Sequence, residues 1–177
     1  YSGLIDTSFT DNGLNTQSSP QSYKVDFFTR DSNQFSQSLP ASSIYLSIGA
    51  QNEALNLSWQ EEVPWNNTSY VVYRSLDNGV VFDSLTTITT ASYLDTGLVN
   101  DSNYCYYVES YGAYTLAELA NDTLINKSQR ICGIPIDTIP PCPPALSVSN
   151  DCDFVGNDLG GFRFDNRLEW MQDIVCG

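Results

Sequence analysis

The residues that could do chemistry are five cysteines and 21 carboxylates, because the chain contains no histidine. Without histidine, the usual general base, the common hydrolase triads and most zinc and haem sites are missing. A pair of carboxylates can still hydrolyse glycosidic bonds, but the acidic residues here stand mostly in turn sequences. We therefore expect no catalytic residue and no enzymatic reaction from this chain.

The five cysteines all lie in the second half of the chain, and no two of them form a C-x-x-C pair. This spacing argues against a zinc ribbon or a thioredoxin-type site. Sparse cysteines in an acidic chain rich in threonine and asparagine favour disulfides formed in an oxidising compartment. The odd number leaves one thiol free or paired outside this segment. The five are Cys105, Cys132, Cys142, Cys152 and Cys176.

The charge of the chain excludes one class of partner. Seven Lys and Arg side chains against 21 carboxylates give a net charge of −14, so we expect no nucleic-acid binding. Acidic turns can hold calcium, but no EF-hand or nonapeptide repeat is present, and we expect no cofactor and no dedicated metal site. The turn carboxylates that could contribute to a structural calcium site are Asp95, Asp101, Asp122, Asp151 and Asp153.

The sequence shows no apolar run long enough to span a membrane and no signal peptide. The chain also begins abruptly inside a repeated pattern. We therefore expect an internal segment of a longer exported protein, without a transmembrane segment of its own.

The elements that would position these residues are strands. In Asn103–Val108 the side chains alternate, with Tyr104, Tyr106 and Val108 on one face and Cys105 and Tyr107 on the other. A period of two with aromatic and β-branched residues is typical of a strand. The turn before it, Ser92–Leu98, has an earlier relative in Ser8–Leu14, which precedes a similar strand at Tyr23–Phe28. The chain therefore contains a repeat.

Residues 41–135 show the pattern of a complete β-sandwich, with seven short strands joined by turns. Asp77-Asn-Gly79 predicts a two-residue hairpin, because Asn-Gly suits the turn whose twist matches the strands. A long loop is expected over Gly112–Asp122. The strands are expected at Ile44–Ile48, Leu55–Trp59, Tyr70–Arg74, Val80–Asp83, Leu85–Thr90, Asn103–Val108 and Leu124–Cys132.

The flanking parts repeat pieces of this pattern. Residues 1–40 look like the second half of a sandwich, with a hairpin loop at Thr29–Asn33, and residues 136–144 form a proline-rich linker. Residues 145–177 begin the pattern again, because Leu146-Ser-Val148 mirrors Leu46-Ser-Ile48 and Leu168-Glu-Trp170 mirrors Leu57-Ser-Trp59. We therefore expect an all-β chain with one complete and two partial sandwiches in tandem. Half a sandwich cannot cover its own core, so the partial ones need further chain or a partner.

These residues resemble fibronectin type III repeats, which are immunoglobulin-like β-sandwiches. The marks are Leu57-x-Trp59, Tyr70-x-Val72, and Gly97-Leu98 followed by Tyr104-x-Tyr106-x-Val108. The resemblance implies that Trp59 lies in the core on the second strand and that Trp170 is its counterpart in the next repeat. It also implies that Tyr104, six residues after Leu98, forms a tyrosine corner whose hydroxyl bonds to the turn backbone.

A closer resemblance is to the repeats of very large cell-surface proteins of Bacteroidota, which are associated with gliding motility and leave through the type IX secretion pathway. It rests on Val63-Pro-Trp65, Tyr104–Val108, Ser128–Asp137 and Pro140–Leu146. It implies a cell-surface, non-catalytic stalk or adhesion module. The expected partners are other repeats of the same chain, surface glycans, or translocon and carrier proteins of secretion.

Two other functions remain open. The segment could be a spacer module of a secreted polysaccharide-degrading enzyme, with catalysis elsewhere in the chain. It could also be a type IX secretion cargo captured with its translocon or carrier.

In such a sandwich the last strand, carrying Cys132, pairs beside the strand of Cys105, whose side chain faces outward. We therefore predict a cross-strand disulfide between Cys105 and Cys132. Cys152 and Cys176 are the next pair, and they would link the start of the third unit to the end of its second strand. Cys142 is then left over, although a bridge between Cys142 and Cys152 is an alternative.

Ligand binding and modification have weaker sequence signals. Core packing accounts for most tyrosines, which leaves Tyr107, Tyr111 and Tyr114 as outward or loop candidates for a ligand. Asp-Ser or Asp-Thr before an apolar residue resembles the O-glycosylation motif of Bacteroidota, and it places candidate acceptors at Ser84, Thr123 and Thr138. Sequons for N-glycosylation stand at Asn56, Asn66, Asn67, Asn100, Asn121 and Asn126.

Overall fold

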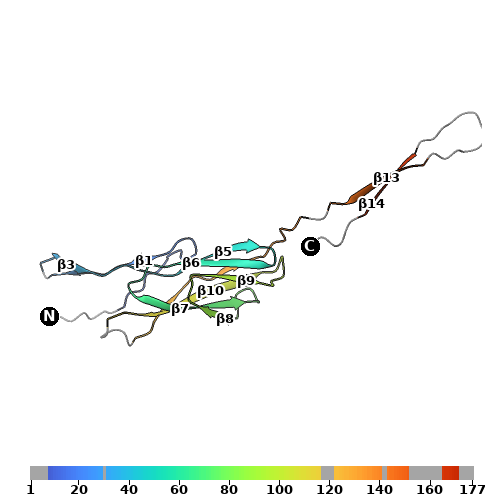
Figure 1. The fold of residues 1–177 in the computed structure, drawn as a ribbon. Helices are drawn as coiled ribbons and strands as arrows, with labels where there is room; N and C mark the ends of the chain where they lie inside the picture. Colours follow the sequence, from blue (N-terminus) through green and yellow to red (C-terminus); the bar gives the residue numbers. More distant parts are fainter. Residues whose placement is uncertain (1–7, 30, 117–121, 141–142, 152–164, 172–177) are drawn as a thin grey trace, which may run out of the picture. The chain divides into compact units, whose positions relative to one another are not determined.

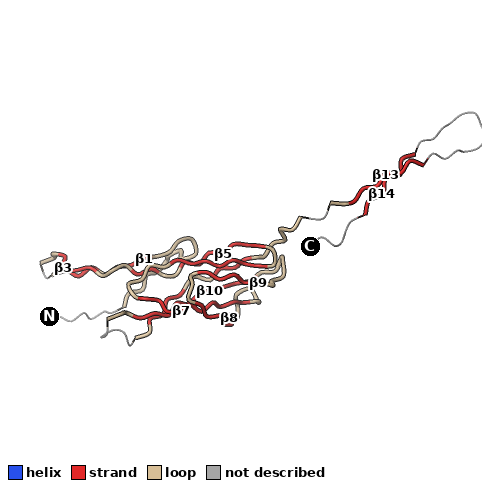
Figure 2. Tube along the Cα trace, in the orientation of Figure 1, coloured by secondary structure: helices blue, strands red, loops and turns tan. Residues whose placement is uncertain are grey.

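The computed structural model describes residues 8–29, 31–116, 122–140, 143–151 and 165–171. In these ranges every regular element is a strand and none is a helix, so the predicted all-β fold is confirmed (Figure 2). The chain divides into two compact units, residues 1–137 and 138–177. The expected domain limits at residues 40 and 135 stay predictions.

The centre of the first unit is a sandwich of two sheets (Figure 1). One sheet has three strands in the order β5-β6-β9, and the other has the order β11-β10-β7-β8, with β12 also paired to β10. The predicted sandwich is therefore present. The bounds of the first sheet are β5 Tyr45–Gln51, β6 Ala54–Gln60 and β9 Ser92–Thr96. Those of the second are β7 Asn66–Ser75, β8 Asp83–Ile88, β10 Tyr104–Ala113, β11 Leu124–Lys127 and β12 Ile131–Gly133.

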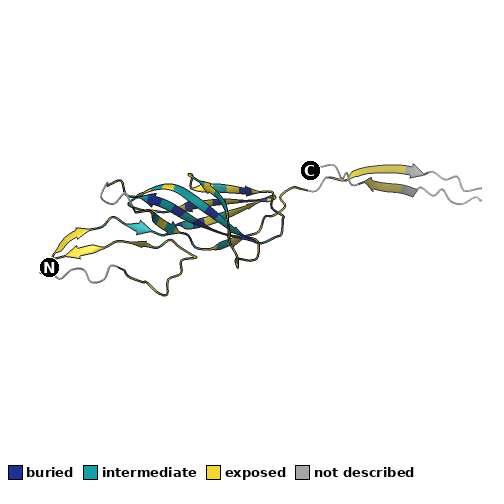
Figure 3. Ribbon diagram, turned by 90° about the horizontal axis from the view of Figure 1, so that it is seen from below, coloured by how far each residue is buried: buried dark blue, intermediate teal, exposed yellow. Residues whose placement is uncertain are grey.

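The core lies between these two sheets, where the alternating apolar residues of both meet. In hairpin β5–β6, Leu46 stands opposite Trp59 and Ile48 opposite Leu57, so one face of the hairpin is continuous apolar surface. In Figure 3 the buried residues gather on the strands of the sandwich. The buried members of the core cluster are Ile44, Leu46, Leu55, Leu57, Trp59, Val72, Leu98, Tyr104, Tyr106 and Val108.

The last strand of the sandwich is broken in two. Strand β11 pairs with the second half of β10 and β12 with the first half. Between them Ser128 donates its N–H to the Val108 carbonyl, while its Oγ accepts the Val108 N–H, each over 2.9 Å. The serine hydroxyl thus takes the place of a backbone carbonyl, and the single strand predicted over Leu124–Cys132 is corrected to β11 and β12.

The turn at Asp77-Asn-Gly79 also differs from its prediction. Asn78 and Gly79 do have positive φ values of 60° and 85°, but the β7–β8 ladder ends at the pair Arg74 and Asp83. The carboxylate of Asp77 accepts the N–H groups of Val80 and Val81 at 3.1 and 2.9 Å. These bonds fold the chain back on Asp77, so a longer loop replaces the predicted two-residue hairpin.

Strand β10 is longer than predicted, because it runs to Ala113 and includes the first residues of the expected loop. Gly112 allows this pairing. A Cβ at this position would lie 2.5 Å from the backbone oxygen of Asn66 on the neighbouring strand β7, a distance that no side chain tolerates.

Two two-stranded ribbons flank the sandwich in sequence. The first pairs β2 with β3 and β1 with β4, and it contains the predicted hairpin loop at Thr29–Asn33. The second, in unit 138–177, is the hairpin β13–β14. Their bounds are β1 Ser22–Tyr23, β2 Asp26–Phe28, β3 Gln34–Gln37, β4 Ala41–Ser42, β13 Ala145–Asp151 and β14 Asp165–Met171.

The chain passes through the sandwich from one end to the other. Before β5, Ser42 donates its N–H to the carbonyl of Glu62 over 2.7 Å. After β12, Ile136 donates to the carbonyl of Gln51 over 3.2 Å. Because Ser42 and Gln51 flank opposite ends of β5, we call the first the leading end of the sandwich and the second its trailing end.

Candidate functional site

The turn before β10 is tied to that strand by a tyrosine hydroxyl. The N–H of Val99 donates to the Tyr104 hydroxyl over 3.0 Å, and the neighbouring Leu98 is buried in the core. This is the bond that a tyrosine corner requires. It holds the turn against the sandwich, so Tyr104 has a structural role here.

One charged group lies almost completely buried next to the core. Asp95 is 3% exposed. Its carboxylate accepts two contacts from Arg74 Nη1, at 2.9 and 3.2 Å, and one from the Tyr106 hydroxyl at 2.7 Å. Burial, together with the hydrogen bond to Asp95, raises the pKa of Tyr106 above its ordinary value. Buried charges are tolerated when they are paired in this way, so the cluster joins the two sheets and presents no open acid or base.

The disulfide that the sequence predicts is present, and it joins Cys105 to Cys132. The two residues stand opposite each other where β10 pairs with β12. Cys105 faces the outer side of its sheet but is fully buried, and an added Cβ on Gly79 would lie 3.6 Å from its Sγ. The Asp77 loop therefore covers the outer face at this point, while Cys132 is exposed.

An aromatic cluster covers the same outer face. Tyr73 and Tyr107 stack with centroids 4.5 Å apart, and Phe82 meets Tyr107 edge-on at 5.0 Å. The ammonium of Lys127 lies 4.0 Å from the Tyr107 ring centre, and Arg130 lies over Phe82. Tyr107 is thus only 9% exposed, and its predicted surface for a ligand is already occupied by the protein's own side chains.

Tyr111, the second ligand candidate, is also engaged. Its hydroxyl donates to Glu109 over 3.0 Å, and Glu109 forms an ion pair with Lys127. Burial, together with a hydrogen bond to Tyr111, raises the pKa of Tyr73 well above its ordinary value. These side chains act as a small second core on the outer face of β7 and β10.

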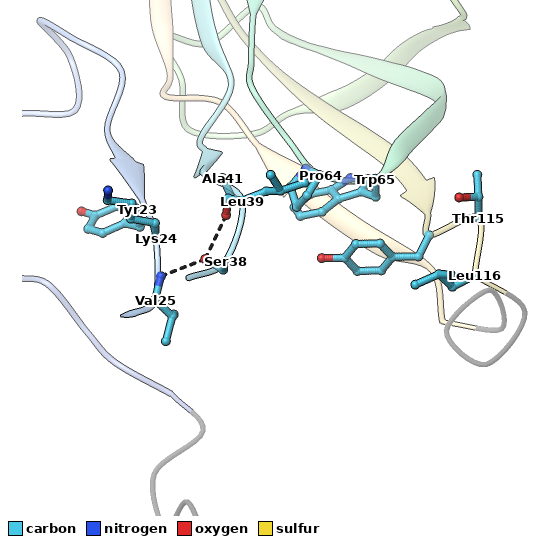
Figure 4. Close-up of a pocket in the computed structure, with 11 residues that line it drawn as sticks. Tyr23, Lys24, Val25, Ser38, Leu39, Ala41, Pro64, Trp65, Thr115 and Leu116 are labelled. Atoms are coloured by element: carbon cyan, nitrogen blue, oxygen red, sulfur yellow. Dashed lines mark hydrogen bonds between the residues drawn. The ribbon is translucent and has the colours of Figure 1, made fainter. Parts of the chain in front are cut away.

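The third ligand candidate, Tyr114, lines an open groove at the leading end of the sandwich. There its ring meets that of Trp65 edge-on, with centroids 6.1 Å apart. Figure 4 shows Pro64, Trp65 and Leu116 on one side of this groove and Tyr23 and Val25 of the first ribbon on the other. The hollow measures about 490 Å³. Its lining residues are Tyr23, Lys24, Val25, Ser38, Leu39, Ala41, Pro64, Trp65, Tyr114, Thr115 and Leu116.

A polar network behind the groove fixes the orientation of Trp65. The indole N–H donates to Asn67 Oδ1 over 3.0 Å, and Asn67 Nδ2 donates to Glu61 over 2.6 Å. The second oxygen of Glu61 accepts from Ser110 and from Asn126, at 3.2 and 2.8 Å. The groove lining therefore offers an aromatic surface formed by Trp65 and Tyr114.

The three predicted core markers have different environments. Trp59 and Tyr104 are 4% and 9% exposed, whereas Trp170 is 71% exposed. Trp170 stands in hairpin β13–β14, which is paired with no further strand among the described residues of its unit. Its role as a core residue stays a prediction. The indole N–H of Trp59 is buried and has no hydrogen-bond partner, a feature that no sequence pattern predicts.

The three candidate O-glycosylation sites lie on the surface. Ser84, Thr123 and Thr138 are all exposed, which an O-glycan would require, and their modification stays a prediction. Cys142, Cys152 and Cys176 lie outside the described residues, as does the sequon residue Asn121, so the Cys152–Cys176 pairing also stays a prediction.

The described residues form no group of three or more His, Cys, Asp or Glu side chains that could hold a metal ion. Within the same ranges, no helix is long and apolar enough to cross a membrane. Comparison with known proteins gives no further assignment, because no family model matches the chain and no curated protein matches its sequence.

Proposed function

We propose that the chain is a segment of tandem fibronectin type III repeats from a large exported cell-surface protein. Three features support the fold assignment. A three-stranded sheet faces a sheet built from β8, β7, β10 and the broken last strand. Trp59 packs in the core from the second strand of the first sheet, and Tyr104 binds the backbone of the turn before its own strand.

The role of the segment is that of a non-catalytic stalk and adhesion module. The observation that carries this proposal is the path of the chain, which enters the sandwich at its leading end and leaves at its trailing end. Beyond the proline-rich linker, β13–β14 repeats the cross-strand pairs of β5–β6. Domains in which the chain enters at one end and leaves at the opposite end can be joined in series, as a stalk requires.

An extracellular location agrees with the intramolecular disulfide between Cys105 and Cys132, because such bonds persist in oxidising compartments. The association with gliding motility, type IX secretion and Bacteroidota rests on the sequence resemblance alone. The buried carboxylate of Asp95 has a structural part in this fold, because it is bonded to Arg74 and Tyr106.

Surface display can be tested on intact cells of the source organism. An antibody raised against the folded chain is expected to label intact cells, and a membrane-impermeant protease is expected to remove that label. If labelling appears only after the cells are lysed, the proposal of a surface stalk is wrong.

A replacement experiment separates the stalk from the adhesion module. The segment is exchanged in the parent protein for the same number of unrelated β-sandwich repeats. Retained surface attachment would assign it a stalk role alone, and lost attachment with normal display would assign it adhesion. A catalytic domain in the flanking chain, with activity that depends on the spacing, would favour the alternative of an enzyme spacer.

A further inference from the structure

The strands by which the chain enters and leaves the sandwich lie side by side and run in the same direction. Ile44, just before β5, forms a parallel bridge with Ser128, between β11 and β12. Tension on the chain ends pulls β5 toward the leading end and β12 toward the trailing end. Neighbouring parallel strands pulled in opposite directions shear along their length, so the bonds between them are loaded together and not one after another.

We call the contact of β5 and the residues just before it with residues 126–133 the seam. A side-chain amide makes the central hydrogen bonds across it. The N–H of Leu46 donates to Gln129 Oε1 over 3.0 Å, and Gln129 Nε2 donates to the Leu46 carbonyl over 2.7 Å. Asn126 adds a bond from its Nδ2 to the carbonyl of Ser42 over 2.9 Å. Gln129 therefore supplies the donor and the acceptor that a neighbouring strand would offer to Leu46.

The strands also approach closely at the other end of the seam. A Cβ on Gly133 of β12 would lie 2.8 Å from Cγ2 of Ile48 on β5. The missing side chain lets β12 lie directly against β5, so the seam is packed as well as hydrogen-bonded.

The disulfide determines whether β5 or β12 moves when the chain ends are pulled apart. Cys132 on β12 is bonded to Cys105 on β10, so tension that arrives along the chain from the trailing end passes through the sulfur atoms into β10. Residues 106–131 then carry no tension. Gln129 and Asn126 lie within these residues without tension, so they keep their positions in the second sheet. The strand that must move is therefore β5.

We propose that this seam is a mechanical clamp, with Gln129 as the clasp on β5 and the Cys105–Cys132 bridge as its fixed anchor. The proposal rests on the stalk function for its use in the cell. The clamp itself is a property of the folded chain, so it is tested on purified protein and can fail or succeed independently of surface display.

The clasp is tested by holding the 177-residue chain through tags at its two ends and measuring its unfolding rate at constant force. Losing both bonds of Gln129 in the variant Gln129→Leu is expected to raise that rate about 10- to 30-fold, the effect of about two ordinary hydrogen bonds. In urea, where nothing pulls β5 out along its axis, the same variant is expected to raise the unfolding rate less than about threefold.

The matched control is Gln60→Leu, which removes an exposed glutamine from β6 and should leave both rates unchanged. Equal acceleration of Gln129→Leu under force and in urea would reduce Gln129 to an ordinary stabilising residue and overturn the proposal. An unchanged rate under force would also overturn it.

The anchor is tested by the length released on unfolding. The double variant Cys105→Ala, Cys132→Ala is expected to extend roughly 90 Å further than the oxidised chain, because the 27-residue separation then stretches at about 3.3–3.6 Å per residue. The unmodified chain measured with dithiothreitol gives the same readout without a mutation. Equal extension of oxidised and reduced protein would show that the disulfide shields nothing.

Discussion

Hairpins β5–β6 and β13–β14 place the same kinds of residue opposite each other, but only the first is buried. Leu46 faces Trp59 and Ile48 faces Leu57 in the first hairpin. Leu146 faces Trp170 and Val148 faces Leu168 in the second. Leu57 and Trp59 are 0% and 4% exposed, whereas their counterparts Leu168 and Trp170 are 55% and 71% exposed.

The comparison separates two steps of folding. Alternating apolar residues suffice to set the register of a hairpin, because one face then collects all of them. Burial needs an opposing sheet, and β5–β6 finds it in the second sheet, with Val72 of β7 and Tyr106 of β10. A two-stranded hairpin without such a cover is marginal in water, so β13–β14 leaves its apolar residues exposed to solvent.

The largest expected effect comes from truncating the leucine that holds the same position in each hairpin, Leu57 in β5–β6 and Leu168 in β13–β14. Leu57→Ala is expected to lower the free energy of unfolding of the sandwich by about 2–5 kcal/mol, because it leaves a cavity in a closed core. Leu168→Ala should change the free energy of unfolding of its own unit, residues 138–177, by less than about 0.5 kcal/mol, as for a surface substitution. Urea unfolding followed by circular dichroism measures both. Comparable losses in the two variants would mean that Leu168 is buried by a cover of its own.

A second test concerns the covalent tie between β10 and β12, the pair of strands in the sandwich that a disulfide joins. Removing the tie with Cys105→Ala and Cys132→Ala is expected to lower the free energy of unfolding by about 3 kcal/mol, from the loop entropy returned to the unfolded chain. Thermal unfolding of the variant and of the oxidised protein measures the difference. An unchanged midpoint would mean that the hydrogen-bonded ladder holds β12 without the disulfide.

Most strands could be predicted from the sequence because their apolar residues alternate. The pairs β5–β6 and β13–β14 follow from that pattern, and so does the outward position of Cys105 beside Cys132 on the last strand. These features depend on neighbours in sequence and on the general form of a sandwich. They need no knowledge of particular tertiary contacts.

The remaining features depend on contacts between distant residues. Gln129 binds the backbone of Leu46 across 83 positions of sequence, and Ser128 interrupts the last strand by using its hydroxyl in place of a carbonyl. Asp77 redirects a turn that its Asn-Gly dipeptide predicts to be tight. In each case a polar side chain makes a hydrogen bond that a backbone group would otherwise make. The alternation of apolar and polar residues along a strand does not predict such bonds.

The smallest expected effect concerns one ion pair in each region. Glu109 and Lys127 lie 3.0 Å apart on β10 and β11, and Glu109 is 17% exposed, whereas Glu169 in its pair with Arg167 on β14 is 59% exposed. Burial alone would raise the pKa of Glu109, but hydrogen bonds from Lys127 and Tyr111 outweigh it and lower that pKa below the usual 4.5.

A carboxylate whose pKa is lowered in the folded state stabilises it above the unfolded pKa, and this contribution is lost as the pH falls through the lowered value. Glu109→Gln should therefore cost about 0.5 kcal/mol at neutral pH, and the difference from the unmodified protein should shrink as the pH falls below about 4.5. Urea midpoints measured across this range test it, with Glu169→Gln as the matched control at a largely exposed ion pair. A difference that stays constant with pH would mean that Glu109 acts through packing, and the distinction between the two ion pairs would then be lost.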